Sequence, residues 1–76
     1  MATVVALLAI VLQVVDRDRS YRAALLAGDQ ALAGANSFAA IAHYSAALGL
    51  RPDSVAAHIR RGQAYREQRL TDDAIR

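Results

Sequence analysis

The sequence predicts an all-α protein built from antiparallel helix hairpins, and three observations support this prediction. Ala, Leu and Val dominate an apolar content of 55%, whereas aromatic residues contribute only 5%. Small side chains at this density are typical of closely packed helices. Polar turn signals divide the chain beyond residue 20 into segments of helical length. Several residues also recur at an offset of 34 positions, which indicates a helical repeat.

The first fifteen residues carry no charged side chain, and only Thr3 and Gln13 interrupt their apolar run. Fifteen helical residues extend about 22 Å, which is short of the roughly 30 Å hydrocarbon core of a bilayer. Three interpretations compete: a membrane anchor, a secretory signal, and an apolar helix buried against a protein partner. A signal is disfavoured, because no basic region precedes the run and no small-residue cleavage site precedes Asp16. We expect an anchor, with the protein-packed helix as the alternative.

A charged patch, residues 16–19 (Asp-Arg-Asp-Arg), follows this run, and every charged side chain lies at Asp16 or beyond. Such a patch suits a membrane boundary, where Arg can extend its guanidinium to water. It suits a solvated helix turn with local ion pairs equally well. The chain is therefore divided into an apolar helix at 1–19 and a helical region at 20–76.

The helical region should contain consecutive helices joined by short turns. They are expected from Tyr21 to about Gly34, from about Phe38 to Leu48, and from about Val55 to Arg69, and Thr71 is expected to cap a fourth helix. The second helix has a candidate N-cap in Asn36 or Ser37, and the third has one in Asp53 or Ser54. Pro52 cannot continue the second helix.

The 34-residue offset pairs Gly28 with Gly62, and the dipeptide 40–41 (Ala-Ile) with the same dipeptide at 74–75. It also pairs Arg17 with Arg51, Ser20 with Ser54 and Ala23 with Ala57. Thirty-four residues is the tetratricopeptide period. From about Tyr21 to Arg76 the chain resembles that family. The family's small, aromatic and proline positions are matched by Gly28, Ala40, Tyr44, Ala47 and Pro52, and then by Gly62, Tyr65 and Ala74.

The resemblance implies an α-solenoid of stacked hairpins, with one full repeat at about 21–54 and a partial second repeat at 55–76. The first repeat is degenerate, because the family's bulky slots hold Ala24 and Ala27, and its tyrosine slot holds Ala31. The second repeat has His58 and Arg61 in the bulky slots. Small residues belong where helices cross closely, so we expect Gly28 and Gly62 at such crossings. Tyr44, Leu48 and Leu50 should fill the space between hairpins.

The resemblance also implies a function. In this family the first helices of successive repeats line a groove that binds extended or helical peptides. The corresponding positions here are Arg22, Leu25, Asp29 and Leu32, followed by Ala56, Ile59, Gln63 and Arg66. The subclass that clamps a carboxylate uses Lys and Asn in this groove, and this chain lacks that clamp. The alternative is that these residues are solvated or packed against a neighbouring element.

Enzymatic chemistry is not expected. The two histidines, His43 and His58, lie fifteen residues apart on different helices, and there is no nucleophile–base–acid set. Asp72 and Asp73 suit the first turn of a helix, where acids favour the helix dipole. The glycines form no phosphate-binding loop, and no cysteine is present. We therefore expect no cofactor and no metal. The net charge of +2, with nine Arg interspersed among seven acids, makes no stripe suited to nucleic acid.

The sequence thus predicts a protein-interaction scaffold, membrane-associated through residues 2–15, that binds a protein partner or peptide segment. The alternative is a structural subunit whose apolar N-terminal helix packs within a larger protein assembly or oligomer, in which case a cytoplasmic location is expected.

Overall fold

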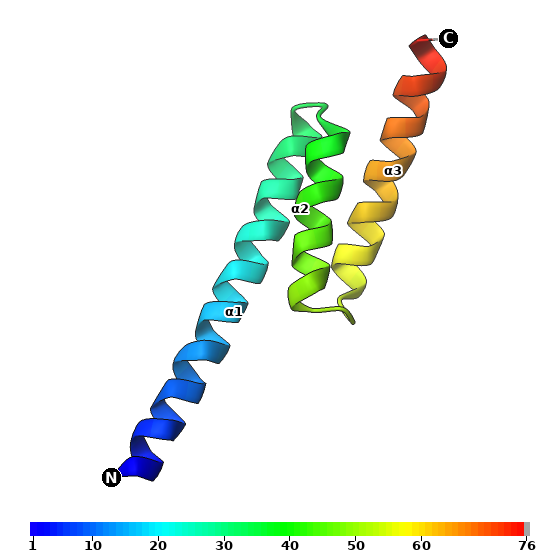
Figure 1. Cartoon of the computed structure of the whole chain (residues 1–76). Helices are drawn as coiled ribbons and strands as arrows, with labels where there is room; N and C mark the ends of the chain where they lie inside the picture. Colours follow the sequence, from blue (N-terminus) through cyan, green and yellow to red (C-terminus); the bar gives the residue numbers. More distant parts are fainter. Residues whose placement is uncertain (76) are drawn as a thin grey trace.

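The computed structural model describes residues 1–75, with side chains through Asp73, and it is all-helical over that range. Its helices are α1 (Ala2–Ala33), α2 (Ser37–Leu50) and α3 (Val55–Ile75), and no strand occurs among these residues (Figure 1). The side chains of Ala74 and Ile75, and the whole of Arg76, lie outside the described part. The expectations placed on Ala74 and on the Ala-Ile dipeptide of the second repeat therefore lie outside it too. The predicted all-α class is confirmed for the described residues.

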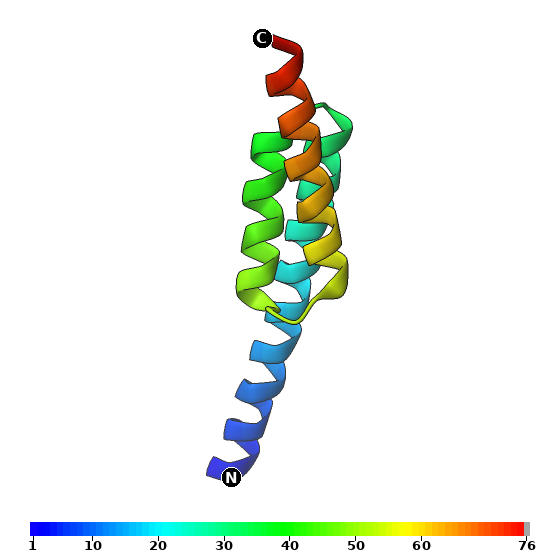
Figure 2. The ribbon, with the colours of Figure 1, turned by 90° about the vertical axis from the view of Figure 1, so that its right-hand side faces the viewer.

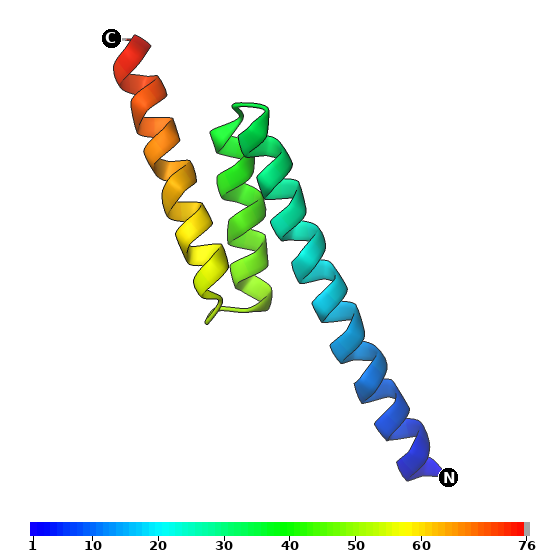
Figure 3. The same ribbon diagram turned by 180° about the vertical axis from the view of Figure 1, so that it is seen from behind.

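Successive helices run in opposite directions, and α2 lies between the other two (Figure 1). The view turned by 90° shows α3 running alongside the α1–α2 pair, and the view from behind shows the same order (Figures 2 and 3). The N-terminal half of α1 extends well past the end of α2. The molecule is consequently elongated, with principal extents of 65 × 20 × 13 Å.

Helix α1 passes without a break through the charged patch at 16–19. Its residues tolerate a helix, because the patch contains no Gly or Pro and Asp18 pairs with Arg22 one turn later, at 3.2 Å. The apolar segment and the first helix of the predicted repeat are therefore one continuous helix of 32 residues.

One of the two candidate caps is present at the start of each of α2 and α3. Asn36 precedes α2, and its Oδ1 accepts a hydrogen bond from the backbone N–H of Ala39 at 3.1 Å. Ser54 precedes α3, and its Oγ accepts from the N–H of Ala57 at 3.1 Å. In the α1–α2 turn, Gly34 has an ordinary negative φ, whereas Ala35 is left-handed, with a φ of 60°. The left-handed conformation of Ala35 is strained, because alanine has a Cβ.

The prediction that the third helix ends at Arg69, with a fourth helix capped by Thr71, is wrong. Helix α3 continues to Ile75, and the Thr71 hydroxyl donates to the Glu67 carbonyl at 3.0 Å, as it does inside a helix. The physical reason lies at residues 68–70, which align with the Gly-Ala-Asn turn after α1. Here they are Gln, Arg and Leu, all good helix formers.

Two small clusters of buried residues join the helices. The first contains Tyr21, Ala47, Leu48 and Ala57, with Leu50 packed against it. The second contains Ala40, Tyr44 and Ala64, with Ala31 and Ile41 at its edge. Alanines at these contacts let α2 approach both neighbours closely. Tyr44 and Leu48 are buried in these clusters and Leu50 packs against the first, so all three fill space between the helices, whereas a stack of hairpins stays a prediction.

Gly28 and Gly62 differ sharply, although both were expected at close crossings. A Cβ built on Gly28 would lie 2.6 Å from Cδ1 and 2.9 Å from Cζ of Tyr44, so the prediction is confirmed there. A Cβ on Gly62 would meet nothing within 4 Å, so the prediction is wrong at that position. The reason is that α2 covers the glycine face of α1, whereas no described helix covers the glycine face of α3.

Candidate functional site

The predicted groove positions on α1 differ in their accessibility. Arg22 is exposed and pairs with Asp18. Leu25 and Leu32 are half-buried, and Leu25 packs against both buried clusters. These two leucines are therefore part of the support for the helices, and they present only an edge to a ligand.

Asp29 connects all three helices. Its Oδ1 accepts a hydrogen bond from the Tyr44 hydroxyl of α2 at 2.6 Å. Its Oδ2 accepts from the Arg60 guanidinium of α3 at 3.1 Å. Both carboxylate oxygens are thus engaged inside the chain, which leaves Asp29 little capacity for a partner. The sequence could not indicate this role, because 15 and 31 residues separate Asp29 from these partners.

The same contact affects the acidity of Tyr44. Burial disfavours the charged phenolate, and both the hydrogen bond to Asp29 and its negative charge add to that effect. The nearby Arg60 acts in the opposite direction. Together these effects raise the pKa of Tyr44 to about 12. Tyr44 is therefore a neutral donor at physiological pH.

The groove positions on α3 are open. Ile59 is 57% exposed, and Ala56, Gln63 and Arg66 are also exposed. An isoleucine flanked by polar side chains can contribute both apolar contact and hydrogen bonds to a peptide. The accessible part of the predicted groove thus lies on α3, with Arg22 on α1.

A second polar contact joins the α2–α3 turn to α1. The Tyr21 hydroxyl lies 2.5 Å from Ser54 Oγ, and the Arg51 guanidinium stacks 4.5 Å from the centre of the Tyr21 ring. Arg51 also pairs with Asp18. The 34-residue offset aligned Arg17 with Arg51 and Ser20 with Ser54. In the structure the next residue of α1 makes the contact in each case: Asp18 pairs with Arg51, and Tyr21 lies against Ser54.

The residues matched to the family's structural pattern fall into three groups. Gly28 of α1 and Ala40, Tyr44 and Ala47 of α2 are buried among the three helices. Pro52 is exposed in the α2–α3 turn, and Gly62 and Tyr65 are exposed on α3. Ala74 lies in the last turn of α3, and its side chain is outside the described part.

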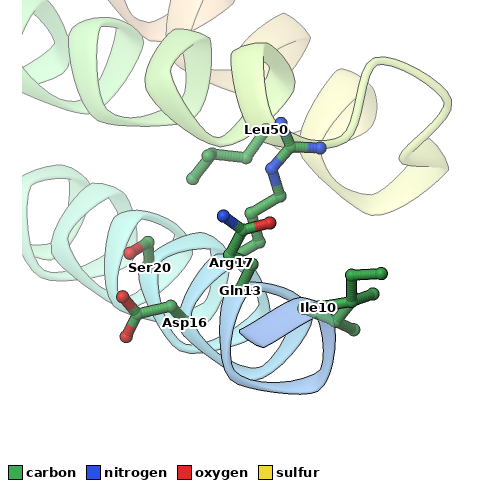
Figure 4. A pocket seen from close by; sticks show the side chains of 7 residues that line it. Ile10, Gln13, Asp16, Arg17, Ser20 and Leu50 are labelled. Carbon is green, nitrogen blue, oxygen red and sulfur yellow. The ribbon is translucent and has the colours of Figure 1, made fainter. Parts of the chain in front are cut away.

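A hollow at the end of α2 was not anticipated from the sequence. It lies where the extended part of α1 passes Leu50, and Arg17 reaches from α1 toward that leucine (Figure 4). Its wall combines apolar and polar side chains of α1: Ile10, Gln13, Val14, Asp16, Arg17 and Ser20. The hollow marks the transition from the extended segment to the bundle.

The N-terminal part of α1, residues 2–15, projects past the end of α2 (Figure 1). It presents apolar side chains on every side. The large apolar residues from Val4 to Val15 are each 49–67% exposed. A helix that is apolar all round is typical of one buried in protein or lipid. Within residues 1–75, however, no helix has both the length and the apolar character needed to cross a bilayer.

The histidines and the paired aspartates are not grouped into a catalytic or metal-binding arrangement among the described residues. His43 is exposed, and His58, also exposed, bonds through Nε2 to the Pro52 carbonyl at 2.9 Å. Asp72 and Asp73 are exposed in the last turns of α3. No group of three potential metal ligands occurs in the described part of the chain.

Comparison with known proteins adds no assignment: no family model, no curated protein and no solved structure matches the chain.

Proposed function

We propose that this chain is a protein-interaction scaffold of the tetratricopeptide-repeat type, tethered through residues 2–15, without catalytic activity. The observation that carries the proposal is the spacing of the contacts that α1 makes with the α2–α3 turn and with α3. Tyr21 to Ser54 and Asp18 to Arg51, which both involve that turn, each span 33 residues, and Asp29 to Arg60 of α3 spans 31. Parallel helices whose contacts are offset by about one period are what a stack of equivalent hairpins requires.

The packing of the first hairpin supports the same proposal. Gly28, Ala40 and Ala47 are small buried residues of α1 and α2, and the Tyr44 ring fills the space that Gly28 leaves. A repeat protein of this kind buries a continuous core by stacking hairpins, and the groove lined by its first helices remains open to a ligand. In this chain the open groove positions are Ile59, Gln63 and Arg66.

The ligand proposed for this groove is an extended or helical peptide from a protein partner. Ile59 supplies an apolar contact, Gln63 supplies an amide donor and acceptor, and Arg66 supplies a charged fork for a carboxylate. Arg22 adds a second positive group on α1. Such a surface suits a peptide of mixed apolar and acidic character.

Binding experiments with Ile59 variants test this function. Peptides selected from a random phage-displayed library against the full chain would be measured by fluorescence anisotropy. Ile59→Glu should weaken their binding about tenfold or more, because it removes an apolar contact and introduces repulsion of acidic peptides. Phe38→Glu is the matched control, since Phe38 is 71% exposed on α2, outside the predicted groove. Selected peptides that ignore Ile59→Glu would contradict the groove.

The tether is proposed because the apolar segment is exposed around its whole circumference. A single partner helix covers one stripe, whereas lipid covers every side. A second candidate function, a structural subunit whose apolar helix packs within a larger assembly, is favoured by length. Residues 2–15 extend about 21 Å, well short of a 30 Å bilayer core.

Vesicle flotation separates these two candidates. The full chain and a chain of residues 16–76 would each be mixed with phosphatidylcholine vesicles and centrifuged in a density gradient. The tether predicts that only the full chain floats with the vesicles. A full chain that remains soluble, monomeric and unattached to lipid would contradict the tether, and association into a discrete complex without lipid would support the second candidate.

A further inference from the structure

The hollow at the end of α2 lies where the apolar segment of α1 (residues 2–15) meets the charged patch (residues 16–19) (Figure 4). Its wall begins with Ile10 in the apolar segment, crosses the patch and ends at Ser20. At 1.5 Å per residue, the stretch from 10 to 20 covers about 15 Å of the helix. The hollow has a volume of about 550 Å³, which is within the range of sites that hold small molecules. It is therefore apolar at one end and polar at the other.

Polar side chains of this hollow share one face of α1. Gln13, Arg17 and Ser20 follow one another at intervals of four and three residues, which places them in line on a helix. Gln13 is one of two polar residues in the apolar segment, and Thr3, the other, does not line the hollow. An amide in apolar surroundings is costly unless it has a hydrogen-bond partner. A ligand with polar groups in the hollow would supply that partner.

Two charged residues of the patch, Asp16 and Arg17, belong to the wall of the hollow. Asp18, by contrast, is engaged within the chain, because it pairs with Arg22 and Arg51. Among the described residues, neither Asp16 nor Arg17 takes part in an ion pair. The hollow therefore offers one positive and one negative group to a ligand.

This pair of charges is complementary to a headgroup that carries both a phosphate and an ammonium. Arginine binds phosphate through paired N–H donors, and a carboxylate accepts hydrogen bonds from a primary ammonium. A quaternary ammonium has no N–H to donate, and proteins typically hold it among aromatic rings. None of the seven residues that line the hollow is aromatic. The lining therefore favours ethanolamine over choline.

We propose that the hollow binds the headgroup of a membrane lipid with a phosphate and a primary ammonium, which is the chemistry of phosphatidylethanolamine. Arg17 holds the phosphate, and Asp16 holds the ammonium. Ile10 and Val14 lie along the acyl chains. Because Leu50 belongs to the wall, the bound headgroup also sets the end of α2 at the membrane surface. The proposal rests on the membrane tether in the proposed function, which brings the hollow to the lipid.

Vesicle flotation over a series of lipid concentrations measures this preference. The full chain would be mixed with phosphatidylcholine vesicles and with the same vesicles containing phosphatidylethanolamine. Partitioning onto the ethanolamine vesicles should be about fivefold stronger, since the ammonium adds a charge-assisted hydrogen bond. Phosphatidylcholine vesicles containing diacylglycerol are the control, because this lipid loosens headgroup packing without adding an ammonium. They should show no comparable gain.

Two charge variants locate the contact. Asp16→Asn should remove most of the preference for ethanolamine, whereas Asp53→Asn should not, since Asp53 is exposed in the α2–α3 turn and does not line the hollow. Arg17→Gln should weaken partitioning onto both phospholipid vesicles about fivefold. Arg19→Gln is its matched control, because Arg19 is an exposed residue of the same patch outside the hollow, and its effect should be smaller. Circular dichroism of each variant establishes that the helices are retained.

Equal partitioning onto choline and ethanolamine vesicles, an equal gain with diacylglycerol, or a preference that survives Asp16→Asn would overturn the proposal. So would equal losses in Arg17→Gln and Arg19→Gln. Excess soluble glycerophosphoethanolamine should leave the preference unchanged, because the tether keeps the lipid at a high local concentration; loss of the preference would assign the hollow to a soluble headgroup instead.

The same measurement separates the headgroup site from the tether on which it depends. A full chain that floats with all the vesicles without the preference would refute the headgroup site and leave the tether intact. A full chain that floats with none of them would refute the tether, and the headgroup site with it.

Discussion

Replacing the two aligned glycines with alanine should change stability in opposite directions. Alanine gains about 1 kcal/mol over glycine in a helix interior, and this gain is common to Gly28→Ala and Gly62→Ala. Gly62→Ala meets no atom within 4 Å, so it should stabilise the chain by about 0.5–1 kcal/mol. Only the packing around the added methyl group then distinguishes the two variants.

At Gly28 the added methyl group would overlap the Tyr44 ring, with Cδ1 at 2.6 Å and Cζ at 2.9 Å. That ring cannot move cheaply, because it is fully buried and its hydroxyl is bonded to Asp29. Overpacking of this kind costs about 1–3 kcal/mol. Gly28→Ala should therefore be less stable than Gly62→Ala by about that amount.

Thermal unfolding monitored by circular dichroism measures the difference. For a domain of this size, 1 kcal/mol corresponds to about 4–8 °C, so the midpoints should differ by about 4 °C or more. Urea unfolding of the same variants provides the free energies and tests for a constant slope. Gly28→Ala with a midpoint equal to or above that of Gly62→Ala would refute the close contact between α1 and α2.

Three further predictions concern single side chains. The pKa of Tyr44 is raised to about 12 from an ordinary value of 10, so the stability that the neutral Tyr44 side chain contributes should be complete below pH 10 and lost as the pH rises through 12. In urea unfolding measured at alkaline pH, Tyr44→Phe should remove this loss of stability, whereas Tyr65→Phe should not. Tyr21→Phe should destabilise the chain by about 1 kcal/mol in urea unfolding through loss of the bond to Ser54, and an unchanged midpoint would show that bond to be absent in solution. Ala35→Gly should raise the thermal midpoint, with a gain of up to about 1 kcal/mol, because it relieves a φ of 60°; a lowered midpoint would contradict the left-handed turn.

Local signals in the sequence predicted most of the helices. Asn36 and Ser54 are caps whose side chains bond to backbone groups three residues away, so their roles are encoded within one turn. The buried position of Tyr44 was predicted by the resemblance, which placed it at the family's aromatic position. The two caps depend on sequence spacing alone.

Other features depend on which helices are present to make contacts. The pattern that placed Gly28 at a crossing placed Gly62 at one too, but only Gly28 has a helix across from it. Asp29 was expected in the groove, yet its two oxygens bind Tyr44 and Arg60 on other helices. The end of α3 was also missed, because the repeat pattern predicted a turn where the local residues favour a helix.

The central claim is that the α2–α3 turn, at the start of α3, contacts α1 at an offset of about one repeat. Isotope-edited nuclear Overhauser spectra of the full chain test it most directly. The structure predicts cross-peaks from the Tyr21 ring protons to the β-protons of Ser54 and to the side chain of Arg51, which stacks 4.5 Å from the ring centre. A chain with its helices formed and Tyr21 assigned, but with neither cross-peak, would contradict the stacked-repeat account.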